Sequence, residues 1–135
     1  MIKKLIVFLF ISIVLSGCLP SVSKKTGKEN AGEFVKGAVV EDFPNLPLYK
    51  GAKVIETYGQ DKKYGGSFIV ADSPEKVVNF YVKSLPAGGW QSTLAQNSGS
   101  NYVFSISNPG FSGEIIVNRA ADGKQTAITI SVVPR

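Results

Sequence analysis

The sequence predicts an α+β domain in which an antiparallel sheet of about five to six strands carries one helix on one face. Two observations lead to this prediction. Apolar residues alternate with a period of two at several places, whereas only one segment has helical spacing. Short polar links join the predicted strands, which favours antiparallel pairing. The expected order is β-β-α-β-β-β-β, and one helix covers only one face of such a sheet.

The first two strands are expected to form a hairpin. Pro44 and Pro47 mark an irregular segment that precedes them. Residues 53–58 and 65–71 are then rich in apolar and β-branched side chains, and residues 59–64 between them are polar. We therefore expect a strand, a turn and a partner strand here. The apolar residues Phe34, Val35 and 38–40, further upstream, are expected to form a short helical turn or an edge strand where the fold begins.

The helix is predicted from Ser73 onward. Ser73 is a suitable N-cap, and Pro74 occupies the first helical position, where its missing N–H has no cost. Pro86 and Gly88-Gly89 are expected to end the helix. The residues that share its apolar face are Val77, Phe80, Tyr81 and Leu85.

From Trp90 onward the pattern has a period of two. It predicts strands over residues 90–96, 102–107 and 114–119, and a last strand that places Ile128, Ile130 and Val132 on one face. Asp122-Gly123 is a typical hairpin turn between the last two strands. The opposite face of this sheet is rich in Ser and Thr, so we expect it to contact water or a partner.

The N-terminus has the features of an export signal. Lys3 and Lys4 precede an apolar run over the 11 residues 5–15, in which Ser12 is the one polar residue. At about 1.5 Å per residue, this run spans about half of a ~30 Å hydrocarbon core. It therefore indicates the apolar region of a secretory signal rather than a permanent membrane span.

The segment Leu15-Ser16-Gly17-Cys18 resembles the lipobox of bacterial lipoprotein signal peptides. The resemblance implies a diacylglyceryl group on the Cys18 sulfur, the site of lipid attachment, and cleavage just before Cys18. The alternative is a plain signal peptide in which Cys18 is an ordinary small residue. The expected organisation is a signal peptide over 1–17, a lipidated flexible tether over 18–40 and a single globular domain over 41–135. Leu19 in place of Asp resembles an outer-membrane sorting signal, facing the periplasm, if the bacterium has two membranes.

The charge balance of the domain excludes nucleic acid as an expected partner. The whole chain has a net charge of +5, which falls to +3 without Lys3 and Lys4. Residues 41–135 carry nine basic and eight acidic side chains, so the domain is nearly neutral. The basic excess lies close to the predicted anchor, where lysines either attract anionic lipid or keep the tether solvated.

The sequence has no histidine and one cysteine. The commonest general base at neutral pH and the commonest metal ligand are thus both missing, and the cysteine is assigned to lipid. We therefore expect no disulfide, no metal site, no cofactor and no catalytic residues.

Two short motifs suggest catalysis but have simpler explanations. Residues 73–76 match the Ser-x-x-Lys of penicillin-binding proteins and serine β-lactamases, and residues 25–27 match their Lys-Thr-Gly. The second motif lies in the predicted tether ahead of the first, which is the wrong order, and Ser73 as an N-cap explains the same residues. Glu41-Asp42 is an acidic pair that we expect in a solvated loop, the alternative being half of a two-carboxylate glycosidase site.

Five aromatic residues have either of two roles. At core spacing such side chains usually pack inside, although they also line grooves that bind sugars or peptides. The five are Trp90, Phe80, Tyr81, Tyr102 and Phe104.

A second resemblance covers roughly residues 44–92. The segments 47–53 and 72–81, followed by Leu85 and Gly89-Trp90, are similar to a small domain of uncharacterised bacterial lipoproteins. That pattern implies no activity. The sequence thus predicts a lipid-anchored cell-envelope lipoprotein that acts as a non-enzymatic binding module. Its partner would be an envelope protein, peptidoglycan or a small ligand. The alternatives are a small envelope hydrolase and a structural subunit of an envelope assembly.

Overall fold

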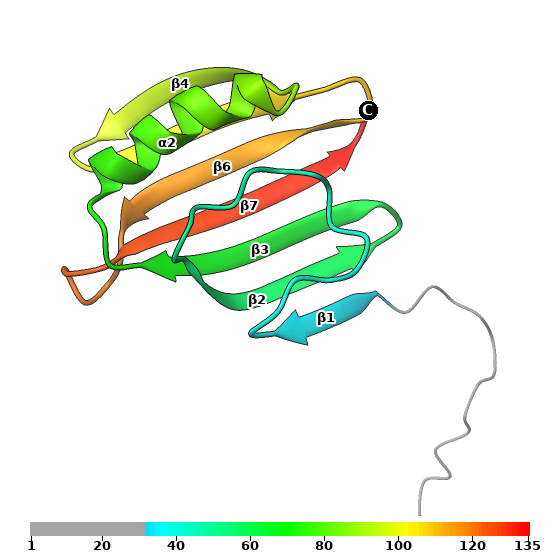
Figure 1. Ribbon diagram of the computed structural model, residues 1–135, viewed down its shortest axis with the longest axis horizontal. Helices are drawn as coiled ribbons and strands as arrows, with labels where there is room; N and C mark the ends of the chain where they lie inside the picture. The colour runs from blue at the N-terminus through cyan, green and yellow to red at the C-terminus, as the bar shows by residue number, and fades with distance from the viewer. Residues whose placement is uncertain (1–31) are drawn as a thin grey trace, which may run out of the picture.

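The computed structural model describes residues 32–135, so the predicted signal peptide and Cys18 lie outside the described residues. The described part forms one seven-stranded sheet with one helix, α2 (Figure 1). The strands are β1 (Glu33–Lys36), β2 (Lys53–Gln60), β3 (Lys63–Val70), β4 (Gln91–Ser98), β5 (Asn101–Ser107), β6 (Phe111–Arg119) and β7 (Thr126–Pro134), and α2 spans Pro74–Ala87.

The α+β class is confirmed, but the predicted strand count and order are wrong. The observed order is β-β-β-α-β-β-β-β, because β1 adds a strand to the N-terminal edge. This strand has four residues and no clear alternation, and Glu33 and Lys36 are both charged. It lies within the segment predicted as a tether, so the folded part includes residues ahead of the expected boundary at 41. Of the two forms expected near Phe34, the edge strand is the one observed.

All neighbouring strands pair antiparallel, in the order β1-β2-β3-β7-β6-β5-β4. The C-terminal strand β7 lies between β3 and β6 in the middle of the sheet, where it joins the two hairpins that are far apart in sequence (Figure 1). Ile128, Ile130 and Val132, the three residues of β7 predicted to share a face, are all buried in the core. Residues 63–70 and 126–134 thus meet only through the tertiary fold.

The predicted turns and the predicted helix are present. Asp61 and Lys62, between β2 and β3, both have positive φ, as a two-residue hairpin turn requires. At the β6–β7 turn, the Asp122 carboxylate accepts hydrogen bonds from the Lys124 and Gln125 amides. These bonds hold the pKa of Asp122 below its ordinary value. Ser73 caps α2 by accepting from the Lys76 amide.

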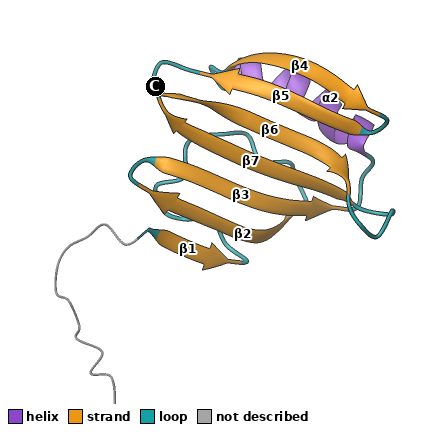
Figure 2. Ribbon diagram, turned by 180° about the vertical axis from the view of Figure 1, so that it is seen from behind, coloured by secondary structure: helices purple, strands orange, loops and turns teal. Residues whose placement is uncertain are grey.

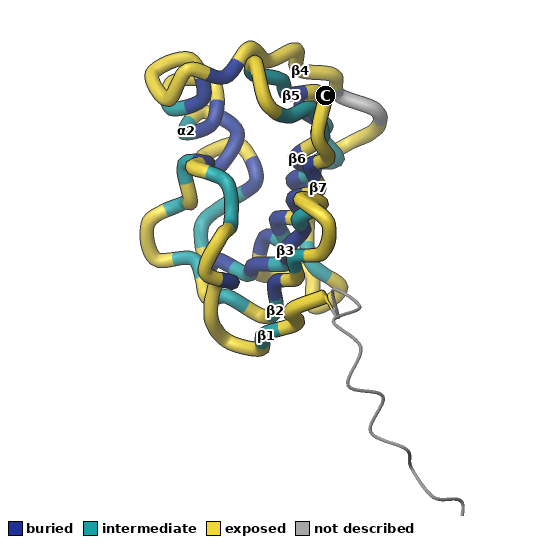
Figure 3. Tube along the Cα trace, turned by 90° about the vertical axis from the view of Figure 1, so that its right-hand side faces the viewer, coloured by how far each residue is buried: buried dark blue, intermediate teal, exposed yellow. Residues whose placement is uncertain are grey.

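The core lies on one face of the sheet, here called the inner face. Helix α2 covers it next to β4 and β6, and residues 37–52 pass over the β2–β3 half (Figure 1). Figure 3 shows the buried residues gathered between the sheet and these two covers. The buried apolar side chains of the core include Leu46, Phe68, Val77, Tyr81, Leu85, Trp90, Phe104, Ile115, Ile130 and Val132.

The other face, here called the outer face, has neither a helix nor a loop over it (Figure 2). It presents many polar side chains, among which Ser105, Glu114, Thr129 and Ser131 are exposed. This agrees with the expectation of a Ser/Thr-rich face in contact with water. None of the helical structure in residues 32–135 has the length and apolar character needed to cross a bilayer.

Candidate functional site

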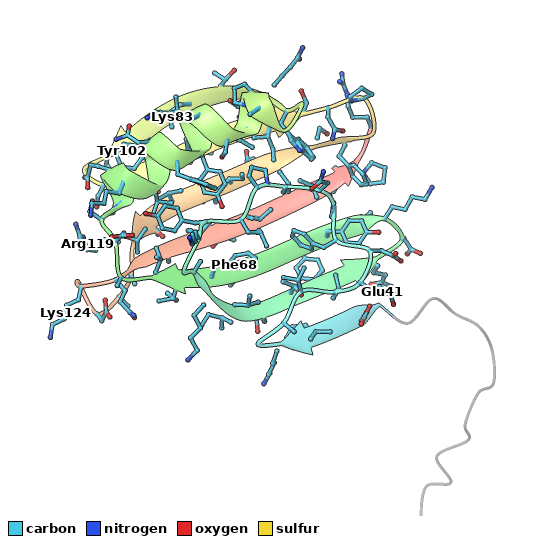
Figure 4. The ribbon with its side chains drawn as sticks, viewed as in Figure 1. Glu41, Phe68, Lys83, Tyr102, Arg119 and Lys124 are labelled. Carbon is cyan, nitrogen blue, oxygen red and sulfur yellow. The ribbon has the colours of Figure 1, made fainter. Side chains whose placement is uncertain are left out.

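A groove of about 530 Å³ lies between the loop ahead of β2 and the exposed side of α2. Tyr49 and Lys50 line it from the loop. The remaining lining residues come from successive turns of the helix and are Lys76, Asn79, Phe80 and Lys83. Lys83, labelled in Figure 4, lies on α2. The groove therefore combines two aromatic rings with three lysines.

The aromatic rings of the groove continue into the core. The rings of Tyr49 and Phe80 meet edge to face with centroids 5.1 Å apart, and Phe80 meets Tyr81 in the same way at 5.0 Å. Tyr81 in turn packs against Phe104 of β5, with the ring centroids 5.9 Å apart. Such pairs add stabilisation beyond their buried area. The aromatic wall of the groove is thus held in place from beneath.

Tyr49 fixes the loop to the helix at several points. Its hydroxyl donates a 2.7 Å hydrogen bond to the Asp72 carboxylate. This hydrogen bond is the largest cause that raises the pKa of Tyr49 and lowers the pKa of Asp72, which also accepts from Lys76. Tyr81 lies below, where burial raises the pKa of its hydroxyl despite a backbone hydrogen bond with Tyr49. The groove wall is therefore preorganised by several independent contacts.

The groove has an excess of positive charge. Lys76 forms an exposed ion pair with Asp72, with Nζ 3.3 Å from Oδ1. Lys50 and Lys83 are exposed, and neither forms an ion pair with another residue in the range 32–135. An anion that enters the groove would meet two ammonium groups that have no carboxylate partner within the described fold. Asn79 adds an amide able to donate or accept.

The structure separates the predicted site residues. Ser73 accepts from the backbone amide of Lys76, while the Lys76 side chain turns to Asp72. This arrangement is the helix cap that the sequence analysis favoured over catalysis. Glu41 and Asp42 are exposed in the loop after β1. Cys18 and the Lys-Thr-Gly at residues 25–27 lie outside the described residues.

The five aromatic residues divide between the two expected roles. Tyr81, Trp90 and Phe104 are buried in the core, whereas Phe80 and Tyr102 are half-buried at its margin. Among these five, Phe80 is the one that lines the groove. Tyr49, which contacts Phe80 in the groove, was not among the candidate residues of the sequence analysis. It lies in a loop 31 residues before Phe80, and only the fold brings the two together. A Tyr-Lys pair beside prolines was its only signal in the sequence.

No metal site can be built from the side chains of residues 32–135, which contain no suitable group of three or more His, Cys, Asp or Glu residues. The groove offers ammonium, amide and aromatic groups, which suit the binding of an anion better than the activation of water.

The comparisons with known proteins identify the family of the domain. No curated protein matches the chain. A family model described as START domain-like matches residues 54–134, which make up more than half of the chain. This region begins in β2 and ends at the last residue of β7, so it contains α2 and all but one of the strands. The chain belongs to the START domain-like family.

Proposed function

We propose that this chain is a lipid-anchored lipoprotein of the bacterial cell envelope that binds an anionic ligand without chemically changing it. The proposed anchor is Cys18, and the proposed binding site is the groove between residues 49–50 and α2. The observation that carries the binding proposal is the pairing of a fixed aromatic wall with Lys50 and Lys83. A small START domain-like domain is compatible with a binding role.

The order of features at the N-terminus supports the anchor. Positive charge, an apolar run too short to span a bilayer, two small residues and Cys18 follow one another as lipoprotein export requires. Two or three acyl chains hold a protein on a bilayer for long times, whereas one chain holds it weakly. The proposed location is extracytoplasmic, and Leu19 favours the periplasmic face of the outer membrane in a bacterium with two membranes.

The chemistry of the groove favours a ligand that carries both a ring or apolar part and a negative charge. The Tyr49 and Phe80 rings offer a surface for packing, and charge-assisted hydrogen bonds from ammonium groups to a carboxylate are among the stronger polar contacts. Peptidoglycan fragments have sugar rings and carboxylates, and they occur where the anchor would hold the protein. We propose fragments of this kind as the ligand class.

The reactive groups near the groove already take part in structural hydrogen bonds, which supports the proposal of a non-enzymatic role. The Asp72 carboxylate accepts hydrogen bonds from Tyr49 and Lys76. Its pKa is lowered, which is the opposite of what a general acid near neutral pH requires. Ser73 acts as a helix cap.

Metabolic labelling with radioactive palmitate tests the anchor. The wild-type chain should be labelled, and Cys18→Ala should lose the label while its precursor accumulates. Ser23→Ala, five residues later, serves as the matched control and should be labelled normally. Undiminished labelling of Cys18→Ala would disprove the anchor.

Calorimetric titration of the mature chain with purified muropeptides tests the binding site. We expect saturable binding that weakens at least several-fold in the double variant Lys50→Ala/Lys83→Ala. Lys124→Ala removes another exposed lysine, at the β6–β7 turn and outside the lining of the groove, and should bind as wild type. Equal binding by both variants would contradict the proposed site. Release of cleaved products during the titration would show a hydrolase instead.

A further inference from the structure

The outer face of the sheet has an apolar corner at its N-terminal edge. Phe34 of β1 lies directly opposite Tyr58 of β2, and the two side chains are 54% and 44% exposed. Ile55, the extra residue of a bulge in β2, is 41% exposed on the same pair of strands. Together these residues form what we call the edge patch. Figure 2 shows that no other part of the described chain covers β1 and β2 on this face.

The Tyr58 ring lies flat on the outer face, against the backbone of β3. Gly65 lies opposite Tyr58 on β3, and a Cβ atom at Gly65 would collide with the Tyr58 ring. The ring therefore lies over the Gly65 backbone, and this glycine is buried although the face is open. Glycine at such a position permits the close approach of another group to the backbone. The result is a broad aromatic surface beside Phe34.

The edge patch is also the part of the sheet nearest in sequence to the proposed anchor. Only residues 19–32 separate Cys18 from β1. A chain of this length spans at most about 50 Å even at full extension. The segment carries Lys24, Lys25 and Lys28 against the single acidic residue Glu29. Positive charge of this kind is attracted to anionic lipid headgroups.

We infer that the edge patch rests on the headgroup region of the membrane in which the chain is anchored, so that β1 lies against the lipid surface. The inference depends on the acylation of Cys18 proposed above. Tyrosine, like tryptophan, favours the boundary between headgroups and acyl chains, because its ring is apolar and its hydroxyl is polar. The edge of β1 that pairs with no strand of the described residues also finds hydrogen-bonding partners among hydrated headgroups rather than in a second sheet.

This placement sets the orientation of the domain. In the sheet order β1 is one edge and β4 is the other, and the groove beside α2 lies on the opposite face from the edge patch. With the edge patch on the lipid, the groove opens away from the membrane. A ligand in the space beyond the lipid surface would reach it without crossing the headgroups.

Site-directed fluorescence in vesicles tests the inference. Cys18 is the only cysteine, and acylation consumes its thiol, so a cysteine introduced elsewhere takes up a thiol-reactive environment-sensitive dye alone. The variants are Phe34→Cys and, as matched control, Val82→Cys on α2, where the side chain is 48% exposed. Both full-length acylated proteins are incorporated into vesicles of phosphatidylethanolamine and phosphatidylglycerol. Iodide quenching and emission wavelength are then recorded.

We expect the dye at position 34 to emit at shorter wavelength and to be quenched several-fold less than the dye at position 82. Replacement of phosphatidylglycerol by phosphatidylcholine should reduce the difference, because the lysines then lose their anionic partner. Equal quenching at both positions in vesicles that float with the protein would overturn the inference and leave the anchor intact. A protein that fails to float with the vesicles would overturn the anchor and the inference together.

A second variant tests whether the edge patch is covered by the membrane or by a second copy of the chain. The dye at position 34 should be fully accessible to iodide when the chain is expressed from residue 18 onward, without the signal peptide, carries Cys18→Ser as well as Phe34→Cys, and is free in solution without vesicles. Shielding of the dye in that state, together with a dimer in sedimentation, would show that a second copy covers the edge patch and would refute the inference. Circular dichroism of each labelled variant verifies that the fold is retained.

Discussion

The two halves of the inner sheet face are covered by different kinds of structure. Beside β4 and β6 the cover is α2, whose backbone hydrogen bonds are largely satisfied within the helix and whose contact with the sheet is apolar. Over β2 and β3 the cover is the irregular segment 37–52, whose backbone needs partners from elsewhere (Figure 1). The comparison teaches that both covers pack apolar side chains on the sheet, Val40 and Leu46 in the irregular segment, but that the irregular cover also needs specific hydrogen bonds.

The hydrogen bonds of the irregular cover come from a few side chains. Thr57 of β2 is fully buried, and its hydroxyl donates to the Ala38 carbonyl and accepts from the Val40 amide, both at 2.9 Å. The Trp90 indole donates to the Asn45 carbonyl at 3.1 Å. Phe43 adds an edge-to-face contact with Tyr64. Each bond joins residues that are at least 17 positions apart in sequence.

The largest effect is expected from a substitution in the helical half. Leu85→Ala removes a fully buried side chain of α2 and leaves a cavity, so the free energy of unfolding should fall by about 3 kcal/mol. Val82→Ala, on the exposed side of the same helix, should change it by less than about 0.5 kcal/mol. Urea unfolding followed by circular dichroism measures both. A similar loss in the two variants would contradict the packing of α2 described above.

A smaller and more local effect is expected in the irregular half. Thr57→Val keeps the shape of the side chain but leaves the Val40 amide and the Ala38 carbonyl without this partner, which should cost about 2 kcal/mol. Hydrogen exchange should accelerate at the Val40 amide more than within α2. Thr129→Val, on the outer face of β7, is the control and should leave Val40 protected. Unchanged exchange at Val40 in Thr57→Val would show that the segment is held in another way.

The smallest effect is expected where the two covers meet. Tyr49→Phe removes the main hydrogen bond that holds the pKa of Asp72 below 3.8, so this pKa should rise toward that value. Because the folded-state pKa is depressed, the Asp72 carboxylate stabilises the fold above pH 3.8, and this contribution is lost as the pH falls through the folded-state value. The variant should therefore lose less stability on acidification. Titration by NMR measures the Asp72 pKa, and Tyr58→Phe should leave it unchanged.

Much of the fold was predictable because its signals are local. The cap at Ser73, the apolar spacing along α2 and the alternation in β5 and β7 are each readable within about ten residues, and the structure confirms them. The connection between β6 and β7 contains the predicted turn residues Asp122 and Gly123, although it runs over residues 120–125 rather than over these two alone. The strand β1 was not assigned in the predicted order, because its four residues are stabilised by pairing with β2 rather than by their own pattern.

The candidate site was far less predictable. Phe80 was predicted on the apolar face of the helix, but Tyr49 and Lys50 belong to a segment without periodicity. Only the bond from Tyr49 to Asp72 and the ring contact with Phe80 bring the two sides of the groove together. The edge patch has the same origin, since Phe34 and Tyr58 become neighbours through the β1–β2 register.

The sequence by itself determined the α+β class, the single helix, six of the seven strands and an N-terminus that resembles a lipoprotein signal. These features depend on the order of residues close together in the chain, where periodicity, capping and turn chemistry act. Only the tertiary structure decided that β7 lies between β3 and β6, that residues 37–52 complete the core, and that a lysine-rich groove and an apolar edge lie on opposite faces. Those outcomes depend on contacts between residues far apart in sequence, whose free energy no local pattern records.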